Sequence, residues 1–208
     1  MRYKKILICI LFLCIVSITV YADETLTVLK KLQSNMGNLD TLSTEFSQIK
    51  NLSFLNQRLE IKGRLYLDKP DRFVWQVDSP LEYKMMINGS DMYQWDGDTG
   101  RTRRISLADD PVFKAAFSQI RLWFSGDYLS MSNDYDISVI SQQPVELRFI
   151  PLSGSGPEEY MTEVIVTFRA DQRYIESIEI REKSGDSMTL KFVNTLINND
   201  IDEQVWRL

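Results

Sequence analysis

The alternation of apolar and polar residues over positions 59–77 constrains the fold of this chain more than any other feature. Every second residue from Leu59 to Leu67 is apolar or glycine, and polar side chains stand between them. After a turn at residues 68–71, Phe73, Trp75 and Val77 repeat the pattern. Successive side chains of a strand face opposite sides, so the segment predicts a β-hairpin with one continuous apolar face. That face covers either an ordinary core or a molecule that is not protein.

The same period of two continues through most of the chain. Turn signals such as Asn88-Gly89 and Asp96-Gly97 separate the alternating segments, and both are typical of hairpins between antiparallel strands. We expect roughly ten or eleven strands at spacings of about 8–12 residues. A mainly β domain of this kind is a sandwich or a barrel.

Two segments follow a helical period instead. Residues 23–50 carry apolar side chains at spacings of three and four, which predicts an amphipathic helix that Gly37-Asn38 can break into two pieces. Residues 109–131 place aromatic side chains at helical spacing, and Gly126 is expected to end this second helix. The second helix either plugs one end of the sheet or covers a cavity.

The N-terminus has the pattern of a secretory signal. Basic residues at Arg2, Lys4 and Lys5 precede an apolar run, and Ala22 offers a cleavage site, so we expect a signal peptide over residues 1–22 and one domain over residues 23–208. The apolar run is shorter than the roughly 20 residues that span a bilayer. Cleavage would remove both cysteines and three positive charges, and would leave a formal charge of −8.

Composition excludes several classes of function. The chain has no histidine, which argues against Ser-His-Asp and Cys-His nucleophiles and against most zinc sites. Its acidic pairs, such as Asp96 with Asp98, stand beside turn residues, as solvated turns do. We therefore expect no enzyme activity, no metal and no cofactor, with a carboxylate hydrolase as a minor alternative. The acidic charge argues against a nucleic-acid partner.

Several short motifs resemble those of the periplasmic lipoprotein-carrier family, LolA. The most specific is Lys69-Pro70-Asp71-Arg72-Phe73-Val74-Trp75. The others occur in the family's order, over nearly the whole chain after the signal: Phe46-Ser47-Gln48, Gly63-Arg64-Leu65-Tyr66-Leu67, Pro80, Asn88-Gly89, Trp95-Asp96, Leu147-Arg148-Phe149-Ile150-Pro151, Gly185-Asp186, Phe192-Val193-Asn194 and Asn198.

The resemblance implies an unclosed antiparallel β-barrel whose apolar concave side is covered by a helical lid. It implies a soluble periplasmic carrier, expected as a monomer, that takes an acylated lipoprotein or a related lipid from an inner-membrane exporter to an outer-membrane acceptor. Lys69 would correspond to the basic residue that latches the lid, where well-known members have arginine; lysine keeps the charge and loses the planar fork of donors. The aromatic segment around Trp123 is closer to LolA-like paralogues that serve exporters of other lipids or pigments.

These expectations define a predicted site. The lid residues are Phe113, Phe117 and Trp123. The predicted cavity is lined by the apolar residues of the alternating segments, with Phe46 from the first helical segment: Phe46, Leu65, Phe73, Trp75, Val77, Met85, Ile87, Tyr93, Trp95, Leu147, Phe149, Val166, Ile178, Met188 and Leu190. The alternatives to a general carrier are a dedicated lipid-binding accessory of a lipid or pigment exporter, and an envelope lipid-binding module that is not a shuttle.

Overall fold

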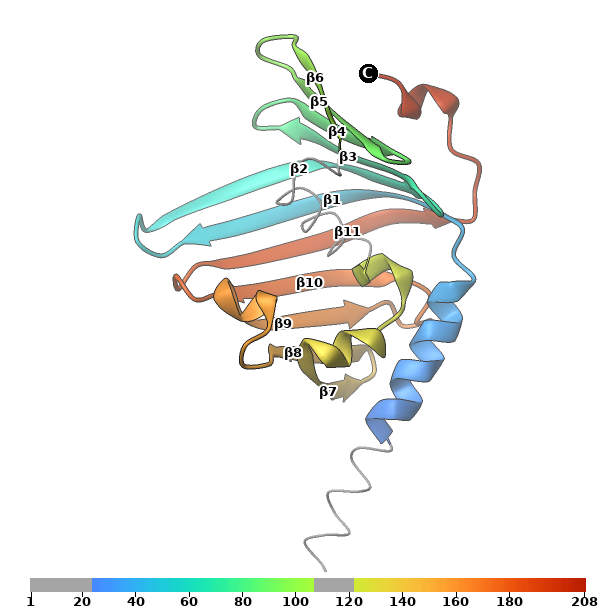
Figure 1. Ribbon diagram of the computed structural model, residues 1–208, viewed down its shortest axis with the longest axis vertical. Coiled ribbons are helices and arrows are strands. Elements are labelled where there is room, and N and C mark those ends of the chain that lie inside the picture. The colour runs from blue at the N-terminus through green and yellow to red at the C-terminus, as the bar shows by residue number, and fades with distance from the viewer. Residues whose placement is uncertain (1–23, 107–121) are drawn as a thin grey trace, which may run out of the picture.

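A computed structural model describes residues 24–106 and 122–208 of the chain, and its main element is one sheet of eleven strands (Figure 1). The strands are β1 (Thr41–Leu52), β2 (Gln57–Asp68), β3 (Arg72–Ser79), β4 (Tyr83–Asn88), β5 (Asp91–Asp96), β6 (Thr102–Ser106), β7 (Tyr135–Gln142), β8 (Val145–Pro151), β9 (Met161–Phe168), β10 (Ile175–Glu182) and β11 (Ser187–Ile197).

The order of the strands makes the sheet an unclosed barrel. It runs β6-β5-β4-β3-β2-β1-β11-β10-β9-β8-β7, so the first strand pairs with the last and the edges are β6 and β7. Every neighbouring pair is antiparallel, as consecutive hairpins require. Unlike a closed barrel, such a sheet leaves one face to be covered by other segments. The mainly β, unclosed antiparallel fold predicted from the sequence is confirmed.

The first predicted helix is wrong in its second half. Residues 24–37 are helical, and the chain then enters β1 at Thr41. The helix ends where the sequence offered a break: the Asn38 side chain donates to the carbonyl of Ser34 at 3.0 Å. In the segment that follows, Leu42 and Phe46 fit a four-residue period and a two-residue period equally well. Hydrogen-bonded pairing with β2 on one side and with β11 on the other makes this segment a strand and not a helix.

The predicted hairpin of residues 59–77 is formed by β2 and β3, with Asp68 opposite Arg72 at its turn. Gly63 lies where β1, β2 and β3 meet most closely. A Cβ atom at this position would lie 1.9 Å from the carbonyl oxygen of Gln76 and 2.8 Å from Cζ of Phe46. The absent side chain lets the Phe46 ring lie flat against the sheet and stack on Trp75, with ring centroids 4.0 Å apart.

Apolar side chains pack on both faces of the sheet. The larger cluster lies on the concave face, where helix 24–37 packs through Leu29, Leu32 and Met36. The smaller cluster lies on the convex face and joins Val74 and Met86 to Trp206. It forms because the chain after β11 folds back across the sheet and ends in the 3₁₀ helix η3 (Glu203–Trp206) (Figure 1).

Several predictions concern residues outside the described part of the chain: the signal peptide over residues 1–22, the part of the second helix over residues 109–121, and the lid residues Phe113 and Phe117. None of the helices in residues 24–106 and 122–208 has both the length and the apolar character needed to cross a membrane.

Candidate functional site

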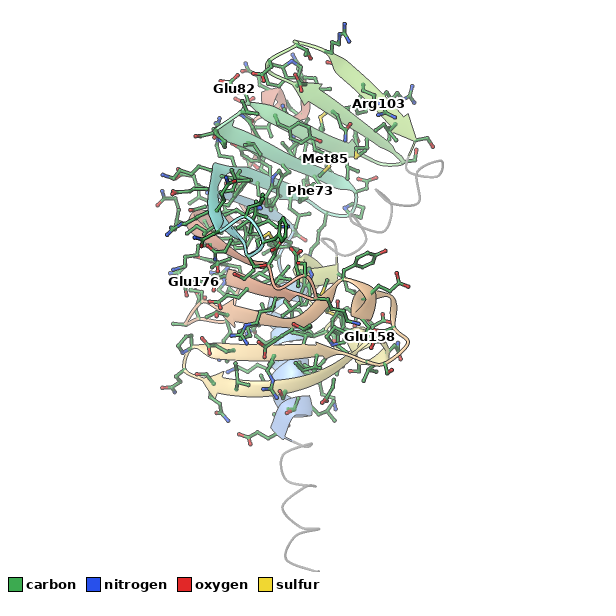
Figure 2. The ribbon with its side chains drawn as sticks, turned by 90° about the vertical axis from the view of Figure 1, so that its left-hand side faces the viewer. Phe73, Glu82, Met85, Arg103, Glu158 and Glu176 are labelled. Carbon is green, nitrogen blue, oxygen red and sulfur yellow. The ribbon has the colours of Figure 1, made fainter. Side chains whose placement is uncertain are left out.

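The concave face carries nearly all of the side chains predicted to line a cavity. Figure 2 looks along the sheet from the tip of the β1–β2 hairpin and shows Phe73 and Met85 on neighbouring strands. Met188 shares its face with Leu190 by strand alternation and is half-buried. The other predicted residues that belong to the concave cluster are Phe46, Leu65, Phe73, Trp75, Val77, Met85, Ile87, Leu147, Phe149, Val166, Ile178 and Leu190.

Two predicted cavity residues lie on the opposite face. Tyr93 packs with Val74 and Met86 in the convex cluster, and Trp95, two residues further along β5, shares its side by alternation. The inward residue of this strand is Met92, which is fully buried on the concave face. The prediction for Tyr93 and Trp95 is wrong because β5 carries large apolar side chains on both of its faces. Alternation alone therefore does not show which face is concave.

An aromatic segment fills the half of the concavity formed by β8–β11. Residues 122–125 are helical, and Trp123 packs edge-on against Phe149 of β8 with centroids 4.8 Å apart. Phe124 contacts Phe192 of β11 in the same way at 5.6 Å. Tyr128 then packs on β8 and β9, with its ring centroid 5.5 Å from that of Phe168. The predicted lid residue Trp123 is therefore seated inside the concavity.

Tyr128 is the most enclosed polar side chain of this segment. Its ring is fully buried, and burial raises the pKa of its hydroxyl. The hydroxyl donates a hydrogen bond of 2.8 Å to the carbonyl of Trp123, five residues earlier in the same segment. Because this acceptor lies in the same segment, the hydrogen bond of the Tyr128 hydroxyl requires no polar group of the sheet. The surface that they present to the strands is apolar.

A strip of the other half of the concave face is only partly covered. Ile61, Trp75, Val77 and Met85, from β2, β3 and β4, are half-buried. Trp75 is the centre of this group, since it stacks on Phe46 and pairs across the sheet with Leu65 and Met85. This half-buried strip is an apolar part of the concave face that stays partly accessible.

Lys69 connects the turn of the β2–β3 hairpin to the helix that covers the concavity. Its Nζ donates to the carbonyl of Met36 at 3.1 Å, in the last turn of helix 24–37, and its backbone N–H donates to the carbonyl of Asp40 at 2.9 Å. Burial lowers the pKa of Lys69, and the charge of Asp40 opposes this shift. A cation at the C-terminal end of a helix is favourably placed with respect to the helix dipole. Lys69 thus links the β2–β3 turn to the end of helix 24–37.

Gly126 brings the two covering segments into contact. Its φ of +81° belongs to the left-handed region, and a Cβ atom here would lie 2.5 Å from Cβ of Met36. The predicted end of the second helix at Gly126 is confirmed, and the positive φ and the close approach of Met36 explain why this residue is a glycine. Met36 is held between Gly126 and Lys69, so helix 24–37 and the aromatic segment dock on the sheet together.

Two openings lie at the margin of this cover. A groove of about 670 Å³ lies between the start of helix 24–37 and β7, and its walls include Leu29, Leu129 and Tyr135. A smaller pocket of about 250 Å³ lies beside Lys69, between Leu67 and Phe124. The groove has the size of many small-molecule sites and is lined mainly by apolar side chains. Both openings lie at the edges of the two covering segments.

Sequence reasoning missed several residues that contribute most to the filled half. Tyr128, Met131 and Tyr135 are fully or almost fully buried, and they lie in and just after the turn that follows Gly126. Their spacings of three and four residues are those of a helix, but the predicted helix ends at Gly126, and the segment instead forms the 3₁₀ helix η1 (Ser130–Asn133) and the start of β7. Phe168 and Phe192 could have been found, because each continues the alternation of its strand.

The sequence and the fold can be compared with known proteins once this geometry is established. A family model described as outer membrane lipoprotein carrier protein LolA matches residues 37–208. This chain belongs to the LolA family. The match begins at the end of helix 24–37 and includes all eleven strands, Lys69 and the convex-face segment around Trp206.

The known proteins that this chain resembles are distant in sequence. The outer-membrane lipoprotein carrier protein of Legionella pneumophila (strain Corby) is 23% identical over 198 residues, which is 95% of this chain and 93% of that protein. An uncharacterised conserved protein of Thermus thermophilus matches in structure with a TM-score of 0.55 at 12% identity, over 90% of this chain and 93% of its own. MucB in the Pseudomonas aeruginosa MucA/MucB complex has a TM-score of 0.55 at 11% identity and covers 86% of this chain, which spans 59% of that one. These structures share the fold.

Proposed function

We propose that this protein is a periplasmic carrier that shields the acyl chains of lipoproteins, or of a related lipid, between the inner and outer membranes. The observation that supports it best is a single sheet whose concave apolar face is covered, within the described residues, by two short segments and not by a second sheet. Membership of the LolA family supports the same role.

The energetics of a carrier require a surface of this kind. Each methylene removed from water contributes about 0.8 kcal/mol, so an acyl chain of about 16 carbons represents roughly 12 kcal/mol. A lipid with two or three such chains cannot cross an aqueous compartment on an exposed patch. It needs a concavity of comparable apolar area, which β1–β4 and β7–β11 provide.

Release requires that the concavity can also be filled by the protein itself. Trp123, Phe124 and Tyr128 occupy the β8–β11 half with their own apolar surface. An acyl chain that enters there displaces these side chains, and their return displaces the chain. Because the two occupants bury similar apolar surface, the free-energy difference between the loaded and the empty protein is small relative to either contact alone. In this scheme Lys69 stabilises the filled state through Met36.

Binding of a fluorescent fatty acyl probe to protein expressed from the full-length sequence tests this function. We expect saturable binding and displacement of the probe by a purified triacylated lipoprotein. A deacylated preparation of the same lipoprotein is the control, and we expect it not to compete. Absence of probe uptake would count against any carrier role.

Depletion in cells separates a general carrier from a dedicated one. Accumulation of many lipoproteins in the inner membrane is the expected result for a general carrier. The loss of a single lipid product, with lipoproteins correctly sorted, would instead assign the protein to one lipid or pigment exporter. The inner-membrane donor and the outer-membrane acceptor can then be found by cross-linking in the same cells.

A further inference from the structure

The tip of the β1–β2 hairpin presents an apolar pair to solvent. Phe54 is 96% exposed and Leu55 is 55% exposed, in a turn that joins two of the longest strands of the sheet. Figure 1 shows this tip extending past the ends of the neighbouring strands. Phe54 is the most exposed large apolar side chain among the described residues. Nothing in the packing of the described chain requires a phenylalanine at this position.

The tip is nevertheless held in a fixed conformation. Asp186, in the β10–β11 turn, accepts hydrogen bonds from the backbone N–H of Ser53 at 2.9 Å and from its hydroxyl at 3.0 Å. These bonds lower the pKa of the Asp186 carboxyl, as expected for a carboxylate that they stabilise. Asn51 donates to Ser187 at 3.1 Å beside them, and Asn56 closes the turn on Ser53. The two apolar side chains are therefore exposed on a rigid support, which lowers the entropy lost on binding.

Apolar residues lead from this tip to the concave face. Leu59 is 40% exposed and Ile61 is half-buried, and both share the face of Leu65 by alternation along β2. Opposite Ile61 in the sheet is Gln48, and the next pair on the same face is Gly63 with Phe46, whose ring stacks on Trp75. A track of accessible apolar side chains thus joins the tip to the half-buried strip of the candidate site.

The shape of the tip favours a lipid bilayer as its partner. A stable protein interface buries about 800 Å² on each side, whereas a phenylalanine contributes only about 200 Å². Two projecting side chains flanked by Ser53 and Asn56 are too small for such an interface. A bilayer is fluid and accepts a small wedge without a complementary pocket. Of the basic residues near the tip, Lys50 and Lys62 are paired with Glu182 and Glu60. Arg58 forms no ion pair within the described residues, so its guanidinium is available to lipid phosphate groups.

We propose that the β1–β2 hairpin inserts Phe54 and Leu55 into a lipid bilayer, and that an acyl chain then passes between the bilayer and the concave face along Leu59 and Ile61. This inference rests on the proposed carrier function. In this proposal the protein contacts the membrane surface directly. The contact is weak because only two side chains are inserted, so the protein binds and leaves quickly.

Flotation with protein-free vesicles tests the insertion. Vesicles of phosphatidylethanolamine and phosphatidylglycerol are mixed with protein expressed from the full-length sequence, and the floated fraction is measured. We expect the wild type to float and the double variant Phe54→Ser, Leu55→Ser to lose affinity by about tenfold or more. Leu81→Ser removes a leucine that is 62% exposed in another loop, and we expect it to float as the wild type does.

Each contrary result overturns the proposal. Equal flotation of the double variant and the wild type would show that the tip does not insert. A second contrary result is wild-type protein that fails to bind protein-free vesicles but binds native envelope vesicles in a way that requires Phe54 and Leu55. That result would assign the tip to a protein partner. A dimer in sedimentation that the double variant abolishes would assign it to a second copy of the chain. Because both side chains are exposed, the thermal unfolding midpoint of the variant should match that of the wild type.

The acyl-probe assay separates this proposal from the carrier function. We expect the double variant to bind the free probe in detergent-free buffer as the wild type does, and to lose only transfer from vesicles. Normal probe binding with no flotation of the wild type overturns the membrane contact and leaves the carrier function standing. Flotation without probe binding by the wild type overturns the carrier function.

Discussion

A glycine and two aromatic rings define the centre of the candidate site at the scale of single residues. Gly63 leaves room for Phe46, and Phe46 supports Trp75, whose indole is the most central of the half-buried side chains. Strand alternation predicted the apolar face that these residues share. It could not predict that Gly63 is required, because the contact comes from the Gln76 carbonyl of a neighbouring strand and from the Phe46 ring.

Gly63→Ala should destabilise the fold. The new Cβ would overlap the Gln76 carbonyl oxygen, a backbone atom that cannot move without shifting β3. We expect the free energy of unfolding in urea to fall by about 3 kcal/mol. Gly156→Ala is the matched control, since no atom lies within 4 Å of its added methyl group, and its stability should be unchanged. Equal stability of the two variants would contradict the close approach at Gly63.

Lys69→Leu should weaken the docking of the cover without removing the binding surface. The variant loses the hydrogen bond to the Met36 carbonyl, which contributes about 1 kcal/mol, so the acyl probe should bind up to about fivefold more tightly. Release of the probe to acceptor vesicles should slow by a similar factor in stopped-flow measurements. Lys62→Leu, at an exposed position, should change neither rate nor affinity. Loss of probe binding in Lys69→Leu would show that Lys69 belongs to the binding surface.

Opposite faces of the sheet have different roles at the scale of elements. The concave face meets helix 24–37 and the aromatic segment, whereas the C-terminal segment packs on part of the convex face. This segment is held by Arg72, which lies 4.6 Å above the Trp206 ring and forms an ion pair with Glu203 at 3.3 Å. Lys84 donates to the carbonyls of Val205 and Arg207 on the same side. These contacts come from β3 and β4, the strands that carry Trp75 and Met85 on their other face.

Trp206→Ala and Trp75→Ala should therefore have different effects. Trp206 is buried against Val74 and Met86, so its truncation should cost about 3 kcal/mol of unfolding free energy and leave acyl-probe affinity unchanged. Trp75→Ala should reduce probe affinity by about tenfold at a smaller cost in stability, because Trp75 is half-buried. Urea unfolding and probe titration on both variants give the comparison. A loss of probe affinity in Trp206→Ala alone would mean that the faces are assigned the wrong way round.

The elements show where sequence reasoning succeeds and where it fails. Strands with one apolar face, such as β2 and β8, were predicted with the correct sides, because burial on one face leaves a clear alternation. In β5, Met92 faces the core while Tyr93 faces the C-terminal segment, and a strand with apolar residues on both sides gives no such signal. The sequence predicts a helix for β1 because the four-residue spacing of Leu42 and Phe46 fits a helix as well as a strand. The choice between the two depends on pairing with the neighbouring strands β2 and β11, which the local sequence does not contain.

The whole molecule is a curved sheet with one covering segment on part of its convex side and two on its concave side. The convex segment is held by charged side chains of β3 and β4. The concave cover consists of helix 24–37 and the aromatic segment of residues 122–128, which meet at Gly126 and Met36, and Lys69 links the helix to the sheet. In a carrier built this way, lipid should contact the concave face only.

Site-specific photo-cross-linking at Trp75 and Trp95 tests this expectation most directly. Both are half-buried tryptophans on strands of the same half of the sheet, and they face opposite sides. A photoreactive phenylalanine analogue replaces each in turn, and cells are irradiated before acylated lipoproteins or lipids are detected on the protein by mass spectrometry. We expect lipid-bearing adducts from position 75 and none from position 95. Adducts from position 95 alone, or equal yields from both, would contradict binding on the concave face.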